Sequence, residues 1–521
     1  MKTMKNKSIW TVLITISLLT TSCLSELNVQ PVVENTFENL IAKDPNAAKG
    51  IMAKMYASFT LAGNEGPGTS ELKGDDAGES PFLRGIFNLE ELTTDMAKNR
   101  WGDDGLDQLT TNTKWDENNK FFRYTYNRIY FTVAQCNNFI NVLKTANVAE
   151  KESFVAETKF LRALAYFYLV DFYGKGALVT ETDFGSSETK AESTRKEIFD
   201  YVVKDLKSIE DQIPLKNEYG RANRSAVRML LAKLYLNAEV YTGQKSYDDA
   251  LTYAKKVIDE GGYTLADKYL SVFSGDNNTS TEIIFPLVCS AQTSQSYGNT
   301  TYITNGSASN ETMPLNEFGL QDGWGGHRTT KALYGLFGNL TTSTDQRSKL
   351  FFTRGHNYEM EDYKKWTDGY PSTKFRNANF NGTTLLSSFS NVDFPLFRIA
   401  DAYLMYAEAV LRGATGGSAT QALTYVNAIR TKRSITEGGL SITASDLTLN
   451  FILDERAREL SFEGHRRTDL IRFGKFTGSS YVWPWKGGTA TGTSIPETYK
   501  LFPVPLTALQ ANPKLSQNLG Y

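Results

Sequence analysis

The chain is poor in the residues from which metal sites, disulfide frameworks and nucleophilic active sites are built. Its 521 residues include only three cysteines and three histidines. No two histidines have the H-E-x-x-H spacing of a zinc protease, and the G-x-S-x-G turn of a serine hydrolase is absent from the sequence. We therefore expect no metal site and no enzymatic activity. Cys136 and Cys289 could pair or remain free as small buried hydrophobes, and the sequence leaves that choice open.

An excess of charge of one sign is also lacking. The formal net charge is −2 at pH 7 and the pI is near 6.1. Proteins that bind nucleic acids need a clustered basic face, so we expect no nucleic-acid partner. Acidic residues are plentiful, so a glycosidase with two catalytic carboxylates remains an alternative. The distance between the two carboxylates in space defines that mechanism, and composition does not reveal this distance. No motif in the sequence marks such a pair.

Long hydrophobic runs are missing as well. The apolar run at residues 9–19 follows three lysines and ends before small residues and Cys23. It is shorter than the ~20 residues of a transmembrane helix and has the form of a secretory signal peptide, which we place at residues 1–22. Small residues before a cysteine are typical of bacterial lipoproteins, in which Cys23 becomes the lipidated first residue. Because Thr20 stands where a bulky apolar residue is commoner, a signal peptide cut elsewhere, with Cys23 as a spare thiol, is the alternative.

Apolar residues recur at helical spacing through the first half of the chain and again near residue 400. The pattern, with its Gly and Pro stops, predicts helices at residues 46–62, 120–145, 151–173, 195–213, 223–241, 247–259, 397–412 and 419–433. Ala163 and Tyr166 stand in the same relation as Ala232 and Tyr235, 69 residues later. That offset is close to two tetratricopeptide units of ~34 residues, although ordinary helical hairpins are the alternative.

Two long polar segments, residues 276–316 and 341–391, are rich in Asn, Ser, Thr and Gly with short β-branched runs. Such composition is typical of surface loops with a few short strands, and loops of this length are usually functional or disordered; we expect functional ones. The predicted fold is mainly α, a tetratricopeptide-like helical repeat superhelix with an irregular loop-rich portion that carries short strands and helices. We expect a helical portion at 23–275 and a loop-rich portion at 276–521, with the further helical pair, packed as one unit.

Residues 453–475 form the charge block, in which five acids and five arginines alternate with apolar residues at helical spacing. Glu455 and Glu459, and likewise Glu459 and Glu463, are four residues apart on one helix face and would repel without cations. Arginine holds carboxylates in bidentate fashion, so we expect a compensated, partly buried ion network. A catalytic carboxylate pair is the alternative, because structural networks and active sites both perturb pKa values.

Several stretches resemble a known family. They are A-E-T-K-F-L-R-A-L-A-Y-F-Y-L-V-D-F-Y-G (156–174), G-R-A-N-R-S-A-V-R-M-L-L-A-K-L-Y-L (220–236), F-R-I-A-D-A-Y-L-M-Y-A-E-A (397–409) and N-P-K-L-S-Q-N-L-G-Y (512–521), together with the charge block. On these stretches the chain resembles the SusD/RagB family of outer-membrane nutrient-binding lipoproteins. The resemblance implies four tetratricopeptide-like units and a lipid anchor at the surface of a bacterial outer membrane. It also implies a SusC-like TonB-dependent transporter as partner, whose barrel the protein caps while separate enzymes hydrolyse the glycan.

Three shorter stretches resemble the starch-binding members of this family. They are D-D-A-G-E-S-P-F-L-R (75–84), Y-L-N-A-E-V-Y-T-G-Q (235–244) and W-K-G-G (485–488). This resemblance implies starch or malto-oligosaccharide as the ligand. Another glycan, such as a fructan or a hemicellulose, is the alternative within the same class, and a purely structural partner of the transporter would bind no sugar. No cofactor is expected, and calcium binding is left open.

Sugar recognition needs aromatic faces, which offer a large apolar surface with little conformational entropy to lose. The loop aromatics that qualify are Trp101, Trp115, Tyr297, Tyr302, Trp324, Trp366, Trp483 and Trp485. The resemblance implies that Trp101, Tyr297 and Trp324 form the glycan arc, with Asp76 and Arg84 beside it. We expect Trp483 and Trp485 to be structural or to face a partner.

Two positions depart from the starch-binding pattern. Asn99 stands where the pattern has a second tryptophan, and Asp104 stands where it has an asparagine. We expect both residues to belong to the glycan-binding site. We expect weaker stacking and a specificity that has drifted within α-glucans or beyond them, and restoring the aromatic with Asn99→Trp is expected to tighten binding. Trp324 lies in G-W-G-G (323–326), where the glycines permit a tight turn that projects the indole.

The anchor prediction is tested by Cys23→Ala. Because the apolar run is too short to span a bilayer, acyl chains alone would hold the mature protein, and the substitution should release it into the soluble fraction. Metabolic labelling with a fatty-acid probe measures the modification directly. Persistent labelling of the alanine variant would contradict lipidation at Cys23.

Overall fold

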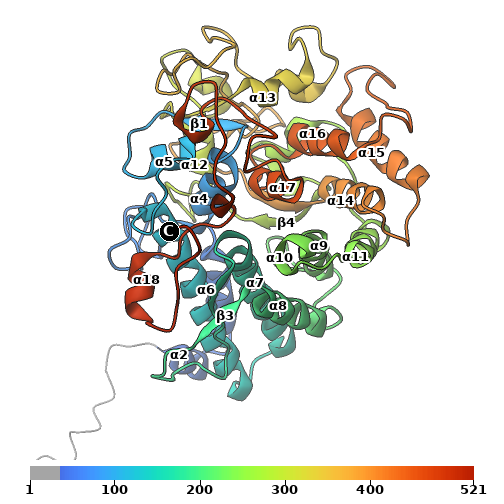
Figure 1. Cartoon of the computed structure of the whole chain (residues 1–521). Helices are drawn as coiled ribbons and strands as arrows, with labels where there is room; N and C mark the ends of the chain where they lie inside the picture. Colours follow the sequence, from blue (N-terminus) through green and yellow to red (C-terminus); the bar gives the residue numbers. More distant parts are fainter. Residues whose placement is uncertain (1–35) are drawn as a thin grey trace, which may run out of the picture.

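Long helices dominate the first half of the chain, and shorter helices, loops and strands make up most of the second half (Figure 1). The structure is a computed structural model that describes residues 36–521. The predicted signal peptide and Cys23 lie outside the described residues. No helix in the described range is both long and apolar enough to cross a membrane.

The helices and strands have the following bounds. The helices are α2 Phe37–Lys43, α3 Ala47–Ala57, α4 Phe82–Phe87, α5 Leu106–Thr111, α6 Lys120–Thr145, α7 Lys151–Phe172, α8 Arg195–Ile209, α9 Arg224–Leu236, α10 Ala238–Thr242, α11 Tyr247–Glu260, α12 Thr300–Gly306, α13 Lys331–Tyr334, α14 Ile399–Leu411, α15 Ala419–Arg433, α16 Leu449–Leu460, α17 Arg466–Arg472 and α18 Leu506–Ala511. The strands are β1 Ala97–Asn99, β2 Lys175–Ala177, β3 Glu192–Thr194, β4 Ile283–Leu287, β5 His327–Thr329 and β6 Phe394–Arg398. A π-helical turn, η1, covers Asn88–Leu92.

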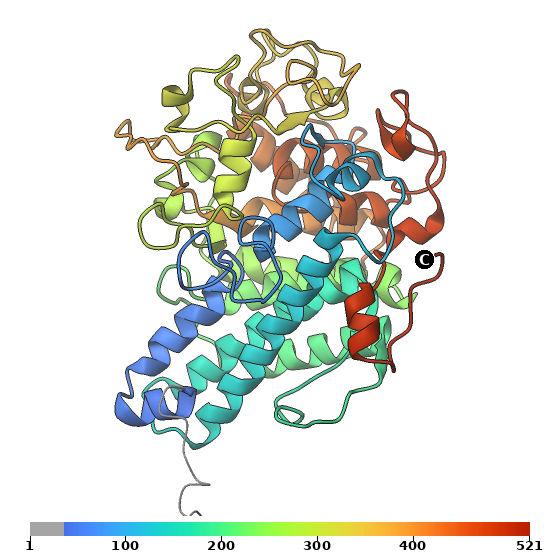
Figure 2. The ribbon, with the colours of Figure 1, turned by 90° about the vertical axis from the view of Figure 1, so that its left-hand side faces the viewer.

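The long helices pack in succession, as a tetratricopeptide-like arrangement requires. α6 contacts α7, α7 contacts α8, α9 contacts α11, α11 contacts α14 and α14 contacts α15. Ala163 in α7, Ala232 in α9 and Ala402 in α14 are all buried, so small side chains lie in the helix contacts as predicted. In Figure 2 the blue and green helices of the first half lie at the bottom and the yellow loops at the top. The predicted mainly α fold with a loop-rich portion is confirmed.

The periodicity located most helices correctly but missed one break. The predictions at 120–145 and 419–433 coincide with α6 and α15. The prediction of a single helix over 223–241 is wrong, because α9 ends at Leu236 and α10 starts two residues later. Between them, the Asn237 amide donates to the Lys233 carbonyl at 2.9 Å and accepts from the Arg472 guanidinium at 2.9 Å. The helix breaks at Asn237, where the side chain bonds to the Lys233 carbonyl and to Arg472 in α17.

Short strands connect parts of the chain that are far apart in sequence. β1 pairs antiparallel with β5, with Asn99 opposite His327. β4 pairs antiparallel with β6, and β2 with β3. The first of these sheets joins the helical portion to the loop-rich portion, because β1 belongs to one and β5 to the other.

The two cysteines in the described range are free. Cys136 and Cys289 are both buried and unpaired, which decides the choice that the sequence left open. Burial raises the pKa of each thiol to about 12. Both therefore stay protonated near neutral pH and pack as small hydrophobes.

The charge block lies on α16 and α17 and forms the predicted buried ion network. At its centre is the fully buried carboxylate of Glu459, which Arg347 approaches to 2.9 Å, Arg398 to 2.7 Å and Arg433 to 2.8 Å. These three arginines come from outside the block. The interpretation as a compensated network is confirmed, but its main cations are supplied by segments up to about a hundred residues away in sequence.

The neighbouring Glu455 shows that the cations outweigh the cost of burial. Burial alone would raise the pKa of this carboxyl, but Arg347, Arg458 and Arg430 more than offset it and hold the pKa at about 2. Arg347 and Arg430 approach its oxygens to 2.9 and 2.7 Å. Glu455 is therefore ionised and fully paired near neutral pH.

Arg466 links the charge block to the segment that precedes β1. Its Nε and one terminal nitrogen donate to the two carboxylate oxygens of Asp95 at 2.8 and 2.7 Å. The Tyr481 hydroxyl donates to the same carboxylate at 2.6 Å. Asp95, Arg466 and Tyr481 thus hold three distant segments together in a site closed to solvent.

Replacing Arg466 should destabilise the fold strongly. Removing one partner of a buried ion pair leaves an uncompensated charge and costs about 3–5 kcal/mol, so Arg466→Ala should lower the melting temperature markedly in differential scanning calorimetry. Lys196→Ala is the control, because it removes an exposed pair with Asp200 and should leave the melting temperature nearly unchanged. Equal melting temperatures for the two variants would contradict the bracing role of Arg466.

Candidate functional site

Three of the predicted site residues, Trp101, Trp324 and Tyr297, come together and form an arc of aromatic rings. The ring centroids of Trp101 and Trp324 are 6.4 Å apart, and those of Trp324 and Tyr297 are 6.3 Å apart. Successive rings are inclined by 49° and 51°, so the surface is curved rather than flat. Tyr297 is 42% exposed, and the two tryptophans are half-buried.

Trp101 is held from three sides at the end of β1. Its backbone N–H donates to the side-chain oxygen of Asn99 at 2.7 Å, and its indole N–H donates to the carbonyl of Trp324 at 3.1 Å. Gly326 lies against the indole so closely that an added Cβ would come within 2.6 Å of it. The indole therefore packs into space that a residue larger than glycine at position 326 would occupy.

The G-W-G-G segment (323–326) packs against the end of α12. The N–H groups of Trp324, Gly325 and Gly326 donate to the carbonyls of Asn305, Ala308 and Gly306, each at 2.7 Å. Gly325 has a φ of +57°, in the left-handed region that glycine adopts without strain. The structure shows an irregular segment here instead of the predicted tight turn, because its N–H groups bond to residues 305–308 and not to one another; these bonds hold the backbone that carries Trp324.

Asp76 and Arg84 shape the turn on which Tyr297 rests. The Asp76 carboxylate accepts from the N–H groups of Gly78 and Glu79, both at 2.8 Å. The Arg84 guanidinium donates to the Gly78 carbonyl at 3.1 Å and lies 4.1 Å from the ring centre of the buried Tyr302. Asp76 is exposed while Arg84 is buried, so the two predicted residues lie beside the arc, as expected, at different depths.

Asn99 lies beneath the arc and not in it. Its side chain is 0% exposed. The oxygen accepts from the Trp101 N–H, which leaves the amide nitrogen to donate to Nδ1 of His327 at 3.0 Å. Burial, reinforced by the nearby Arg84, lowers the pKa of His327 to about 3, so the ring is neutral and its Nδ1 can accept. Asp104, the other departing position, is exposed in the turn that follows Trp101.

The remaining loop aromatics do not join the arc. Four of them are buried in the core: Trp115, Tyr302, Trp366 and Trp483. Trp485 is half-buried, with its ring 4.9 Å from that of Tyr363 and its indole N–H donating to the Met360 carbonyl at 3.2 Å. The expectation that Trp483 is structural is confirmed by its burial.

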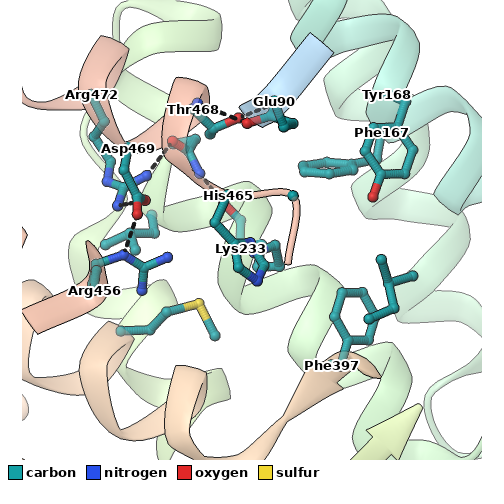
Figure 3. Close-up of a pocket in the computed structure, with 15 residues that line it drawn as sticks. Glu90, Phe167, Tyr168, Lys233, Phe397, Arg456, His465, Thr468, Asp469 and Arg472 are labelled. Atoms are coloured by element: carbon teal, nitrogen blue, oxygen red, sulfur yellow. Dashed lines mark hydrogen bonds and ion pairs between the residues drawn. The ribbon is translucent and has the colours of Figure 1, made fainter. Parts of the chain in front are cut away.

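A buried polar cavity next to the charge block is too small to be a ligand site (Figure 3). Its volume is about 20 Å³, which suits a single water molecule. Its charged groups are already paired: Asp469 with Arg472 at 2.7 Å, and the Lys233 ammonium with the His465 ring at 3.0 Å. Across residues 36–521, no group of three or more His, Cys, Asp and Glu side chains is placed to hold a metal ion.

Comparison with known proteins establishes the family. The model of the SusD family matches residues 343–521, and a model described as starch-binding and associating with the outer membrane matches residues 78–236. The starch-binding protein SusD of Bacteroides thetaiotaomicron is 31% identical over an alignment that covers 96% of each chain. The chain belongs to the SusD family. The resemblance seen in the sequence motifs is thereby confirmed.

Solved structures of SusD family proteins share the fold. A SusD superfamily protein from Parabacteroides distasonis superimposes with a TM-score of 0.71 at 24% identity, covering 92% of this chain and 99% of its own. Surface glycan-binding protein A from Bacteroides thetaiotaomicron, solved with laminarihexaose, gives 0.70 at 20% identity, covering 91% and 99%. At these identities the likeness shows the fold alone.

The burial of Asn99 reverses the expected effect of restoring an aromatic there. A tryptophan at position 99 would have to displace the ring of His327 and the supported Trp101, because its side chain would point into the protein. Asn99→Trp should therefore lower the melting temperature instead of tightening glycan binding. Asp104→Asn, at an exposed position, is the control and should melt like the wild type. A fully stable Asn99→Trp protein with tighter binding would show that this position opens to the surface.

Proposed function

We propose that the protein is a cell-surface, lipid-anchored glycan-binding protein of a bacterial outer membrane, which captures starch or malto-oligosaccharides. Import would proceed through a partner SusC-like TonB-dependent transporter, and hydrolysis would belong to other proteins. The observation that carries the proposal is the arc of Trp101, Trp324 and Tyr297. The similarity to starch-binding SusD along nearly the whole chain supports the choice of glycan.

The geometry of the arc suits a curved polysaccharide. Aromatic faces pack against the apolar C–H faces of pyranose rings, while polar groups at the rim bind hydroxyls. Because successive rings are inclined by about 50°, a helical α-1,4-glucan follows them better than a flat β-1,4-chain does. Asp76 and Asp104 are exposed beside the arc and provide carboxylate acceptors for sugar hydroxyls. Binding of this kind requires no cofactor.

The same role with another glycan is the second candidate. The structure solved with laminarihexaose shares this fold, which means that the scaffold carries sites for more than one glucan. A fructan or hemicellulose ligand, or a glycosidase, would give a different result in the assays below. Release of reducing sugar from the bound glycan by the purified protein would favour the glycosidase.

Removing the central ring of the arc should weaken binding strongly. Truncating a central aromatic of an interface typically costs ~2 kcal/mol or more, and each 1.4 kcal/mol is about tenfold in affinity, so Trp324→Ala should bind maltoheptaose at least about tenfold more weakly. Isothermal titration calorimetry measures this loss. The matched control is Trp485→Ala, which removes a half-buried tryptophan away from the arc and should bind as the wild type does.

The assignment to starch has its own test. Wild-type protein should be retained on insoluble starch and bind maltoheptaose in calorimetry, with inulin and xylan as comparison ligands. Binding to inulin or xylan in the absence of binding to α-glucans would overturn the starch assignment. Binding to no glycan at all would overturn the glycan-binding proposal and favour a purely structural partner of the transporter.

A further inference from the structure

A fourth aromatic ring adjoins Tyr297, at one end of the arc. The centroid of Phe389 lies 5.1 Å from that of Tyr297, with the two rings inclined by 42°. The spacing and the tilt are therefore of the same kind as those between the first three rings. Phe389 lies near the end of the second long polar segment, residues 341–391, shortly before β6, and no sequence motif indicates it.

The segment carrying Phe389 is tied to the residue that positions Trp324. The backbone carbonyl of Asn305 accepts from the Trp324 N–H at 2.7 Å, and the side-chain amide of Asn305 donates to the Ser388 carbonyl at 3.1 Å. Asn305 is itself fully buried. A single immobile residue thus sets the positions of two rings, and the alignment of Phe389 with the arc is a built feature of the fold.

The exposure of Phe389 distinguishes it from a ring that only supports its neighbour. Tyr302 is such a support, since it lies 5.8 Å from Trp101 and is completely buried. Phe389 is half-buried, so part of its ring stays accessible although it contacts Tyr297. The residues that precede Phe389 in the chain also carry exposed apolar side chains: Phe380, Leu385 and Leu386. Apolar surface left open at this end of the arc is available to a ligand.

We infer that Phe389 supplies a fourth stacking position, which extends the arc beyond Tyr297 and makes the site select longer α-glucan chains. This inference rests on the proposed function. A short oligosaccharide can be accommodated on Trp101, Trp324 and Tyr297 alone. A longer chain continues past Tyr297 and gains the face of Phe389, so the contribution of this ring depends on chain length.

Calorimetry with maltotriose and maltoheptaose tests the inference in Phe389→Ala and Phe389→Tyr. Phe389→Ala should weaken maltoheptaose binding by about tenfold, as expected for the loss of one stacked aromatic, and change maltotriose binding by less than about twofold. Phe389→Tyr keeps the ring and should bind both sugars as the wild type does. Phe184→Ala is the control, because Phe184 is a phenylalanine with an exposed side chain in the connection between β2 and β3.

The possible outcomes separate this inference from the function on which it rests. Equal losses for both sugars in Phe389→Ala would mean that Phe389 only supports Tyr297, and no loss for either would mean that it does not contact glycan; both results overturn the inference and leave starch binding intact. Wild-type protein that binds neither malto-oligosaccharide would overturn the proposed function and this inference together. A loss confined to maltoheptaose supports both.

Discussion

The buried carboxylate of Glu459 is the contact on which the C-terminal half depends. Arg347, Arg398 and Arg433 converge on it from a short 3-10 helix at Gln346–Lys349, from the end of β6 and from the end of α15. Arg398 and Arg433 also share Glu282 beside β4, at 2.7 and 2.8 Å. Because an unpaired charge in this interior would be costly, the network is stable only when every segment is in place, and it therefore specifies how the loops pack on the helices.

The same network reaches the glycan arc through a short series of contacts. Arg466 holds Asp95, which lies just before β1, and the Gly464 N–H donates to the buried carboxylate of Glu91 at 2.8 Å. β1 then leads to Asn99 and Trp101. The buried charges of the block thus brace the segment that leads to Trp101, so a block with the composition of an active site has a structural role here.

Local features were predictable from the sequence and long-range ones were not. Helical periodicity located α6 and α15 because each helix has its own amphipathic pattern and end signals. The sequence also indicated that Glu459 needs cations, but the identity of Arg398 as a partner depends on how strands and helices meet in space. Asn99 was assigned to the arc by analogy of position, and its burial became visible only once β1 was paired with β5. Phe389 carries no motif and is recognisable only by its distance from Tyr297.

The arc is assembled from side chains that the fold immobilises before any ligand arrives. Trp101 is packed against Gly326 and bonded to the Trp324 carbonyl, and Trp324 is fixed through Asn305. Rings held in this way lose little conformational entropy when a ligand binds, so less of the binding free energy is spent on ordering the site. Rigidity also means that the curvature of the arc cannot adapt to every glycan. If the arc binds glycan as proposed, selection among glycans follows from which rings are present and where they stand, and Phe389 would change the preferred length without changing the scaffold.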